Sequence, residues 1–405
     1  MSHRTLRRTV APLAVAHVAG ALVQLLTFPY LARVLGPEPW APILVAQALV
    51  AWATILIDHG ADLHGPRAIA AKQARHEPLD ATLWGIQGAK LTVLPVILLL
   101  LTGVMFALPA LHGRADLVAW TLVAATARGL SPLWYFQGVE RAPRAVAIDT
   151  AARIVGALGV LPFVTRPDQG WRVLAAQAVA TTIATGWLTL DLRRAHPLPT
   201  TGLRDAIREA RLQSRSIYAQ RLALTLFLNA NPMLLGLLAP WAPLAAYAAA
   251  ERVVRSLTNI LAPLSQALVP RASALEAATP EAAGQFTRGL LPRVVGGAVL
   301  VAAGLAVAAP TVVQLILGPG YEAAVPLLRL FAPLFPIVAA STVIGSSWAV
   351  PSGRDALVLR ATVAAAITLV GAAALAVPLW GATAMVLATL AAEAVMLFVL
   401  GVRLT

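Results

Sequence analysis

Cysteine is absent from this chain of 405 residues, which excludes disulfides, thiolate chemistry and zinc sites with thiolate ligands. Charge is also scarce: only 12% of the residues are Asp, Glu, Lys or Arg, against about 25% in soluble domains. Lysine occurs only as Lys72 and Lys90. Apolar residues are abundant instead, at 59% with a mean hydropathy of +0.77. The composition therefore predicts a polytopic membrane protein and not a string of soluble domains.

Twelve stretches are apolar enough for helices that cross a hydrocarbon core of about 30 Å, which takes roughly 20 residues. They are 10–35, 40–58, 82–109, 116–137, 143–164, 171–190, 213–238, 242–269, 289–317, 323–349, 356–378 and 380–402. Several contain proline, which membrane helices tolerate where neighbours bond the freed carbonyls. The first stretch is too long for the apolar part of a signal peptide, so we interpret it as a retained span.

Basic residues predict which loops face the cytoplasm, because cytoplasmic loops are enriched in lysine and arginine. With the N-terminus placed inside, most loop arginines and Lys72 fall on the inner side. The outer side has only Arg33, Arg114, Arg166 and Arg172. We therefore expect both termini to be cytoplasmic.

The longest segment outside the expected spans is the middle cytoplasmic loop, at about 191–212. Leu203, Ile207 and Ala210 give this basic segment one apolar strip. We interpret it as a helix at the membrane interface that joins two halves of the chain. A regulatory docking site is the alternative.

An internal repeat occurs at an offset of 201 residues. Pro39-Trp40-Ala41-Pro42 recurs as Pro240-Trp241-Ala242-Pro243, and Arg128–Trp134 has a counterpart in Arg329–Phe335. Each pair of segments occupies equivalent positions in two halves of six spans. Two matches at one offset indicate a duplicated unit.

The repeat predicts the fold. Six is an even number, so both halves enter the membrane in the same sense, as in transporters built from parallel repeats. We expect an all-α integral membrane protein whose twelve transmembrane helices form two pseudo-symmetric six-helix lobes. Residues 1–200 would form the first lobe and residues 201–405 the second, with the substrate between them.

Ionisable residues inside the expected spans point to function. They are Lys90, Arg128, Arg153, Arg221, Arg252, Arg255, Arg329, Asp149, Glu251 and Glu393. Each costs at least about 2.5–3.5 kcal/mol at mid-bilayer, so it normally faces a bundle interior or a wet cavity. Asp149 and Arg153 are four residues apart, as are Glu251 and Arg255, which favours ion pairs. The excess of arginine predicts a cationic cavity for a substrate with phosphate groups.

Structural roles compete with this interpretation of the basic residues. The ion pairs would also serve to hold helices together. Arg128, Arg252 and Arg329 would alternatively bond backbone carbonyls or extend to the interface. Lys90 and Arg221 lie close to the cytoplasmic face, so snorkelling to that interface is the preferred interpretation for both.

Two further acids are candidate sites for a proton or cation. Glu393 has no basic neighbour on its own helix, and Asp58 lies at the cytoplasmic end of the second span. A protonated acid bonded to the backbone is the alternative for Glu393. A solvated interfacial carboxylate is the alternative for Asp58.

Signatures of catalysis are missing from the sequence. There is no G-x-x-x-x-G-K-[ST] loop for ATP and no Asp-x-Asp pair. His59 and His64 are five residues apart, unlike the i, i+4 pair of a helical zinc site. We therefore expect neither an enzyme nor a cofactor. This argues against a membrane-embedded glycosyltransferase or polymerase. The charged residues inside the spans argue against a scaffold that transports nothing.

Five segments share a pattern with one known family. They are Phe28–Glu38, Asp58–Gly60 with Gly65 and Arg67, Pro132–Glu140, Tyr247–Arg252 with Pro263, Gln266 and Pro270–Arg271, and Leu317–Tyr321. Together they resemble the Wzx-type flippases for O-antigen and other polysaccharides, which belong to the MOP exporter superfamily that includes the MATE transporters. The family's count of twelve spans agrees with the count made above.

The resemblance implies movement of an undecaprenyl-diphosphate-linked oligosaccharide from the cytoplasmic to the periplasmic leaflet of a bacterial inner membrane. Alternating access driven by an ion gradient is implied, and the polysaccharide polymerase machinery is an expected partner. Competing functions within the superfamily are a small-molecule or drug antiporter and a flippase for a peptidoglycan-precursor lipid.

These expectations name specific residues. The expected substrate-binding residues are Arg33, Arg128, Arg153, Arg252, Arg255 and Arg329, and the expected ion-coupling residues are Asp58, Asp149, Glu251 and Glu393. Arg128 and Arg329 each lie four residues before a proline, so we hypothesise that they are pseudo-symmetric phosphate ligands. No metal site is expected.

Overall fold

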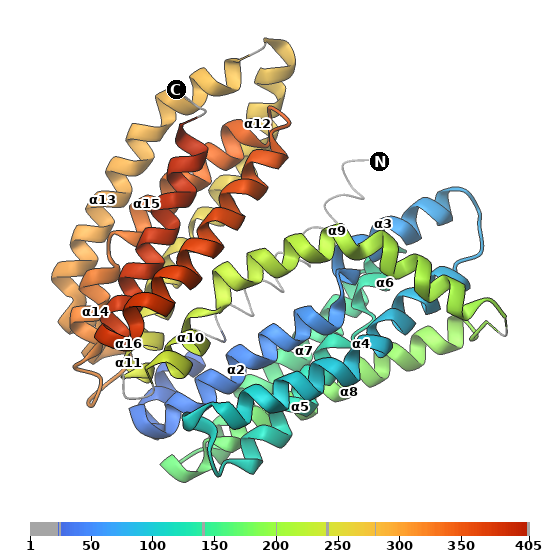
Figure 1. The fold of residues 1–405 in the computed structure, drawn as a ribbon, viewed down its shortest axis with the longest axis horizontal. Coiled ribbons are helices and arrows are strands. Elements are labelled where there is room, and N and C mark those ends of the chain that lie inside the picture. Colours follow the sequence, from blue (N-terminus) through green and yellow to red (C-terminus); the bar gives the residue numbers. More distant parts are fainter. Residues whose placement is uncertain are drawn as a thin grey trace. The chain divides into compact units, whose positions relative to one another are not determined.

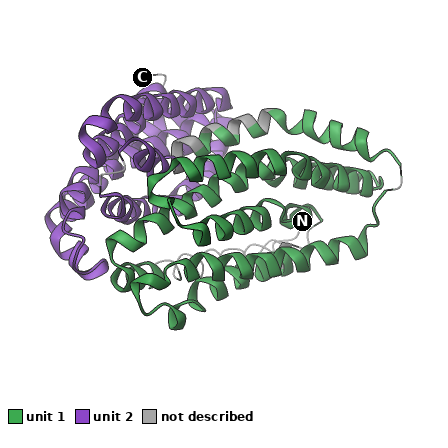
Figure 2. Ribbon diagram, turned by 60° about the horizontal axis from the view of Figure 1, so that its bottom comes forward, with its two compact units in different colours: residues 1–225 green, residues 226–405 purple. Residues whose placement is uncertain are grey.

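The computed structural model describes residues 23, 26–139, 142–199, 201–239, 243–279 and 281–402. Within these ranges the chain is helical apart from turns and short connecting loops (Figure 1). It forms two compact units, residues 1–225 and 226–405 (Figure 2). The boundary falls inside α9 (Leu203–Asn229), later in the chain than residue 200. The two repeat-related lobes remain a prediction.

Unit 1 is a bundle of antiparallel and broken helices. They are α2 (Pro37–Asp58), α3 (Ala61–Ala74), α4 (Asp80–Ala107), α5 (Ala115–Gly129), α6 (Leu133–Gly138), α7 (Ala142–Leu158), α8 (Trp171–Ala195) and most of α9. α5 packs between α2 and α8, while α7 packs on α8 and α3 packs on α6. Buried apolar side chains such as Ile43, Leu49 and Leu117 fill the interior.

Unit 2 contains α10 (Asn231–Leu238), α11 (Leu244–Thr258), α12 (Leu261–Ala278), α13 (Ala282–Ile316), α14 (Ala324–Phe331), α15 (Leu334–Ile344) and α16 (Asp355–Gly401). α13 packs on α14 and α15, and α16 packs on α10 and α15. Gly381 divides α16 into two helices, since its φ of 53° and ψ of −130° are not helical. Glycine accepts this backbone conformation without a steric penalty.

Seven helices among the described residues are long and apolar enough to cross a membrane. They span Pro37–Ala74, Asp80–Ala107, Arg144–Phe163, Pro167–Ala195, Ala282–Ile316, Ala324–Ala349 and Asp355–Gly401. Most of the expected span at 10–35 lies outside the described residues. The expected spans 356–378 and 380–402 fall almost entirely within α16, and Gly381 lies at the start of the second. The protein is thus a multi-pass, all-helical membrane protein, and the count of twelve remains a proposal.

The Asp58-His59-Gly60 segment ends one helix and starts the next. His59 and Gly60 both take left-handed conformations, with φ of 54° and 77°. The His59 amide donates to the Ile55 carbonyl, which caps α2. α3 then begins at Ala61, and the Asp58 carboxylate accepts the Asp62 amide at 2.9 Å. Asp58 therefore stabilises the start of the helix that follows its own.

A second break replaces the continuous span expected at 116–137. α5 ends at Gly129 and α6 begins at Leu133, after Pro132. Proline has no amide proton and cannot continue the helical ladder. The carbonyls of Leu130 and Ser131 are left for other donors, and their partners are polar side chains of α4.

Two glycines of α4 allow α9 to pack very close to it. A β-carbon on Gly85 would lie 2.6 Å from the Ala206 carbonyl oxygen, and one on Gly88 would lie 2.6 Å from the Ile207 side chain. Leu203, Ile207 and Ala210 join the hydrophobic cluster around Trp84. The apolar strip predicted on this basic segment is confirmed, because it faces the core of unit 1.

Replacing Gly85 by alanine is expected to destabilise the protein by about 1–3 kcal/mol, the usual cost of overpacking. The added methyl group would collide with the backbone of α9, which cannot move as a flexible side chain would. Thermal unfolding in detergent measures the change. Gly103→Ala is the matched control on the same helix, since nothing lies within 4 Å of its β-carbon position. That control should gain roughly 0.5–1 kcal/mol from reduced backbone entropy, and equal effects of both changes would refute the close packing.

Candidate functional site

Unit 1 contains a fully buried lysine. Lys90 on α4 has 0% of its side chain exposed, and its Nζ lies 2.6 Å from Asp58 Oδ1. The same ammonium group donates to the Ser131 carbonyl at 3.1 Å. The snorkelling interpretation of Lys90 is therefore wrong, and Asp58 is an ion-paired carboxylate and not a solvated one.

The helix break at Leu130–Pro132 explains why these polar side chains lie on α4. Gln87 donates to the Leu130 carbonyl at 2.6 Å. Lys90, about one turn further along α4, donates to the Ser131 carbonyl. Unsatisfied carbonyls in an apolar region cost several kcal/mol each. Gln87 and Lys90 therefore take the place of the missing helical amides and fix the bend between α5 and α6.

A second ion pair extends this cluster. Arg221 on α9 pairs with Asp62 on α3, and the Tyr218 hydroxyl donates to the Leu56 carbonyl at 3.4 Å. Asp58 links the two pairs, since it bonds both Lys90 and the Asp62 amide. The cluster thus joins α2, α3, α4 and α9 inside unit 1.

Asp80, His196 and Tyr135 form a hydrogen-bonded chain that the sequence did not suggest. His196 Nδ1 lies 2.6 Å from Asp80 Oδ1, and its Nε2 lies 2.6 Å from the Tyr135 hydroxyl. The order carboxylate, imidazole, hydroxyl is that of a catalytic triad, but Tyr135 is only 5% exposed. Trp84 also donates to the carbonyls of His196 and Pro197. We interpret the chain as a structural clamp that holds the segment after α8 against α4 and α6.

Replacing His196 by alanine is expected to lower the free energy of unfolding by about 1–3 kcal/mol, because it leaves the buried Tyr135 hydroxyl without this partner. Thermal unfolding in detergent is the measurement. His112→Ala is the control, since His112 is exposed and the hydrogen bond of its ring in the described structure is to the nearby Phe106 carbonyl. The clamp would be disproved by an H196A protein as stable as H112A.

Unit 2 contains a buried polar network around Glu251. Its Oε1 accepts hydrogen bonds from Asn231 Nδ2 at 2.6 Å and from Arg255 Nε at 2.9 Å. Asn231 also lies 3.2 Å from the Thr389 hydroxyl. Glu251 is 6% exposed and Asn231 is fully buried. The ion pair expected from the four-residue spacing is confirmed. The sequence did not indicate that Asn231 of α10 bonds Glu251, or that Thr389 of α16 bonds Asn231.

Glu393 belongs to the same region. It lies one helical turn after Thr389 on α16, is 5% exposed, and interacts electrostatically with Arg255. The hydroxyl of the buried Tyr247 lies beside Asn231 and Thr389. The structure therefore brings together both expected ion-coupling acids of the second half, Glu251 and Glu393, around one arginine.

The expected ion pair on α7 is also present. Arg153 lies 2.8 Å from Asp149, with 60% of the arginine side chain exposed and 16% of the aspartate. Arg128 on α5 is partly buried and interacts electrostatically with both groups. These three expected residues therefore gather in one place in unit 1.

The remaining expected arginines are dispersed. Arg329 on α14 is exposed and donates to the Ala306 carbonyl of α13 at 3.2 Å. Arg33 is exposed, and Arg252 on α11 is partly buried. Arg33 and Arg252 each make further polar or electrostatic interactions in the structure. Whether Arg128 and Arg329 act as a symmetric pair remains a prediction.

Family and fold relationships agree with this architecture. The profile of the family described as "Polysaccharide biosynthesis protein" matches residues 6–276. A protein of Escherichia coli (strain K12) named "Putative O-antigen transporter" is 26% identical over 361 residues, covering 84% of this chain and 82% of its own length. A protein of Shigella dysenteriae with the same name is 24% identical over 372 residues, covering 89% and 90%.

Two solved structures have a similar fold. "Lipid II flippase MurJ, inward closed conformation" aligns with a TM-score of 0.71 at 9% identity, over 96% of this chain and 86% of that one. An inward-facing multidrug resistance MATE family transporter of the MOP superfamily aligns with a TM-score of 0.69 at 14% identity, over 98% of both chains. At these identities the likeness establishes the fold of a MOP-type transporter.

Proposed function

Because the chain belongs to the polysaccharide biosynthesis protein family, we propose that it is a flippase for an undecaprenyl-diphosphate-linked oligosaccharide. The lipid-linked sugar would move from the cytoplasmic to the periplasmic leaflet of a bacterial inner membrane. The names of the two bacterial relatives support an O-antigen type of substrate, and the MOP-type fold supports a transporter.

The observation that carries the proposal is the Glu251 network inside unit 2. The Glu251 carboxylate accepts hydrogen bonds from Arg255 and Asn231 within apolar helices, and a buried charge is costly unless it is paired in this way. Protonation or cation binding at Glu251 would release Arg255. The released guanidinium would then pair with Glu393, with which it already interacts electrostatically. Ion occupancy would thus change the contacts between α10, α11 and α16, as ion-driven alternating access requires.

Arginines of unit 1 are proposed to meet the diphosphate. Arg153 Nη2 lies 2.8 Å from Asp149 Oδ2, and the arginine side chain is 60% exposed, so substrate phosphate could replace the aspartate as its partner. Arg128 lies near both groups. Guanidinium groups grip phosphate oxygens in pairs and stay charged in an apolar setting. Asp149 would then be the acid that senses whether substrate is bound.

Several coarser features belong to the same proposal. They include twelve spans in two six-helix lobes, residues 1–200 and 201–405, related by the sequence repeat. Both termini would be cytoplasmic. The remaining candidate residues are Arg33, Arg252 and Arg329 for substrate and Asp58 for the ion, although Asp58 already bonds Lys90. The polysaccharide polymerase machinery is the proposed partner.

Reconstitution tests the proposal. Proteoliposomes containing a fluorescent undecaprenyl-diphosphate oligosaccharide are compared with and without a proton or sodium gradient. We expect faster movement with the protein, and at least about a tenfold loss for Arg128→Ala, since a charged hydrogen bond contributes about 1.5–3 kcal/mol. Arg194→Ala, on the exposed last turn of α8, should transport normally.

The alternatives make different predictions in the same assay. Exchange of a small cation for protons without any movement of the lipid-linked sugar would favour a drug antiporter. Movement of a peptidoglycan-precursor lipid at least as fast as that of the lipid-linked oligosaccharide would favour the precursor lipid as the substrate. A protein that moves neither lipid would refute the flippase.

A further inference from the structure

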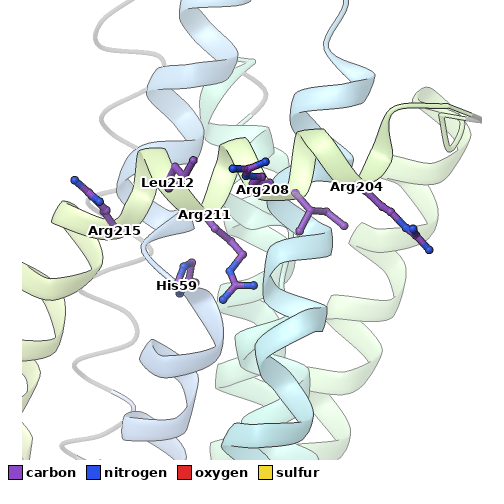
Figure 3. A pocket seen from close by; sticks show the side chains of 7 residues that line it. His59, Arg204, Arg208, Arg211, Leu212 and Arg215 are labelled. Carbon is purple, nitrogen blue, oxygen red and sulfur yellow. The ribbon is translucent and has the colours of Figure 1, made fainter.

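A strongly basic pocket lies on the first part of α9, within unit 1. Its volume is about 520 Å³, and it is lined by His59, Arg204, Ile207, Arg208, Arg211, Leu212 and Arg215. The four arginines are spaced 4, 3 and 4 residues apart, which places them along one side of the helix. Figure 3 shows Arg211 pointing from α9 toward His59, with Arg204 and Arg215 at opposite ends of the group. The pocket is open, so a ligand could reach these side chains.

The arginines of this pocket have no acidic partner in its lining, because none of its lining residues is an acid. Across the described part of the chain, no carboxylate forms an ion pair with Arg204, Arg208, Arg211 or Arg215. Glu209, which lies between them in sequence, instead accepts a hydrogen bond from Gln213 at 2.7 Å. Four guanidinium groups that form no ion pair among the described residues, within about three helical turns, make a site for an anion.

The helix that carries the arginines is firmly held. The adjoining side of α9, which includes Ile207, packs on Gly85 and Gly88 with almost no gap. Arg221 and Tyr218 tie the later turns of α9 to α3 and α2. The arginines therefore project from a fixed helix and not from a flexible loop. A pre-organised site loses less side-chain and backbone freedom when a ligand binds.

The position of the pocket relative to α2 indicates what kind of anion it meets. α2 has 22 residues, so it is about 33 Å long at 1.5 Å per residue, close to the thickness of the bilayer core. His59 follows its last residue and lines the pocket. The pocket therefore lies at the depth of the lipid headgroups, where arginines meet lipid phosphates.

We propose that this α9 pocket binds the phosphate or diphosphate headgroup of a membrane lipid. Its volume suits such a headgroup, since small-molecule sites range over about 300–1,000 Å³. Arg208 and Arg211 provide paired donors for phosphate oxygens, while Ile207 and Leu212 contact the apolar part next to the headgroup. The two sources of this chemistry are a polyprenyl diphosphate and an anionic phospholipid. The site is separate from the residues assigned to transport above, so its test needs no transport.

Binding to the purified full-length protein in detergent tests the proposal. The probes are farnesyl diphosphate, a short-chain phosphatidylglycerol, inorganic diphosphate and farnesol, and native mass spectrometry measures the bound fraction. We expect R208Q/R211Q to weaken binding of the phosphate-bearing lipids by at least about tenfold, or about 1.4 kcal/mol. The affinity of R208K/R211K should lie between those of the unchanged protein and R208Q/R211Q, because lysine keeps the charge but lacks the guanidinium fork.

The matched control is R193Q/R194Q, which removes two exposed arginines from the last turn of α8 and the same amount of charge. It should bind as the unchanged protein does. If R208Q/R211Q weakens binding of farnesyl diphosphate more than binding of phosphatidylglycerol, the ligand is the diphosphate lipid. The reverse result identifies the phospholipid. Three results would each overturn the proposal. The first is equal weakening of binding by both double variants, and the second is unchanged binding by R208Q/R211Q. The third is binding of inorganic diphosphate or farnesol as tight as that of farnesyl diphosphate. The substituted side chains are exposed, so circular dichroism of both variants should match that of the unchanged protein.

Discussion

Replacing Lys90 by methionine is expected to lower the free energy of unfolding by about 3–5 kcal/mol, the cost of breaking a buried ion pair by removing one partner. The change would leave Asp58 without its 2.6 Å partner and the Ser131 carbonyl without a donor. Both groups lie where α2, α4 and the α5–α6 break meet, so little water is present to replace the ammonium group. Unfolding of the purified protein in detergent, by heat or by a denaturant, measures the loss.

Two further variants identify the cause. Asp58→Asn combined with Lys90→Met removes both charges together, and it should recover part of the lost stability because no uncompensated charge remains. Lys72→Met removes the other lysine of the chain, whose side chain is 37% exposed, and should change stability by less than about 0.5 kcal/mol. If K90M unfolds like K72M, the buried pair does not stabilise the fold.

Replacing Glu251 by glutamine is expected to abolish the acceleration of transport by an ion gradient, while binding of the lipid-linked substrate persists. Glutamine keeps the size of the side chain and its hydrogen bond to Asn231, but it can neither be protonated nor pair with Arg255 as an anion. We expect gradient-driven movement in proteoliposomes to fall at least about tenfold, which corresponds to about 1.4 kcal/mol.

The control must separate coupling from folding, because Glu251→Gln leaves Arg255 without its anionic partner. Glu251→Gln combined with Arg255→Met removes both charges, so it should unfold at a higher temperature than E251Q alone and still fail to respond to the gradient. Glu322→Gln, in the loop before α14, should transport normally since its exposed carboxylate accepts only local backbone amides among the described residues. Gradient-driven transport at the normal rate by E251Q would disprove the coupling role.

Local spacing in the sequence was sufficient for part of the charged structure. The i, i+4 spacing predicted the pairs Asp149–Arg153 and Glu251–Arg255, and both are present. The apolar strip on the basic linker predicted which side of α9 packs inward. Such features depend only on the helical period, which is the same in every tertiary arrangement.

The sequence by itself determined the class of this protein. Low charge, high hydropathy and long apolar stretches leave a helical bundle as the way to satisfy the backbone in a bilayer. The family pattern around Pro132 and Tyr247 gave the type of transporter, and the family profile and fold likeness agree with it.

Only the tertiary structure decided which charges are buried and what they bind. Lys90 and Asp58 are 32 residues apart, and Asn231 and Thr389 are 158 apart. No spacing rule links residues on different helices, because their contact depends on how the helices pack and where they break. Lys90 was expected to reach the interface, yet the break at Pro132 exposes carbonyls that need a donor inside the bundle. Helical periodicity is a property of one segment, whereas satisfaction of a buried polar group is a property of everything that surrounds it.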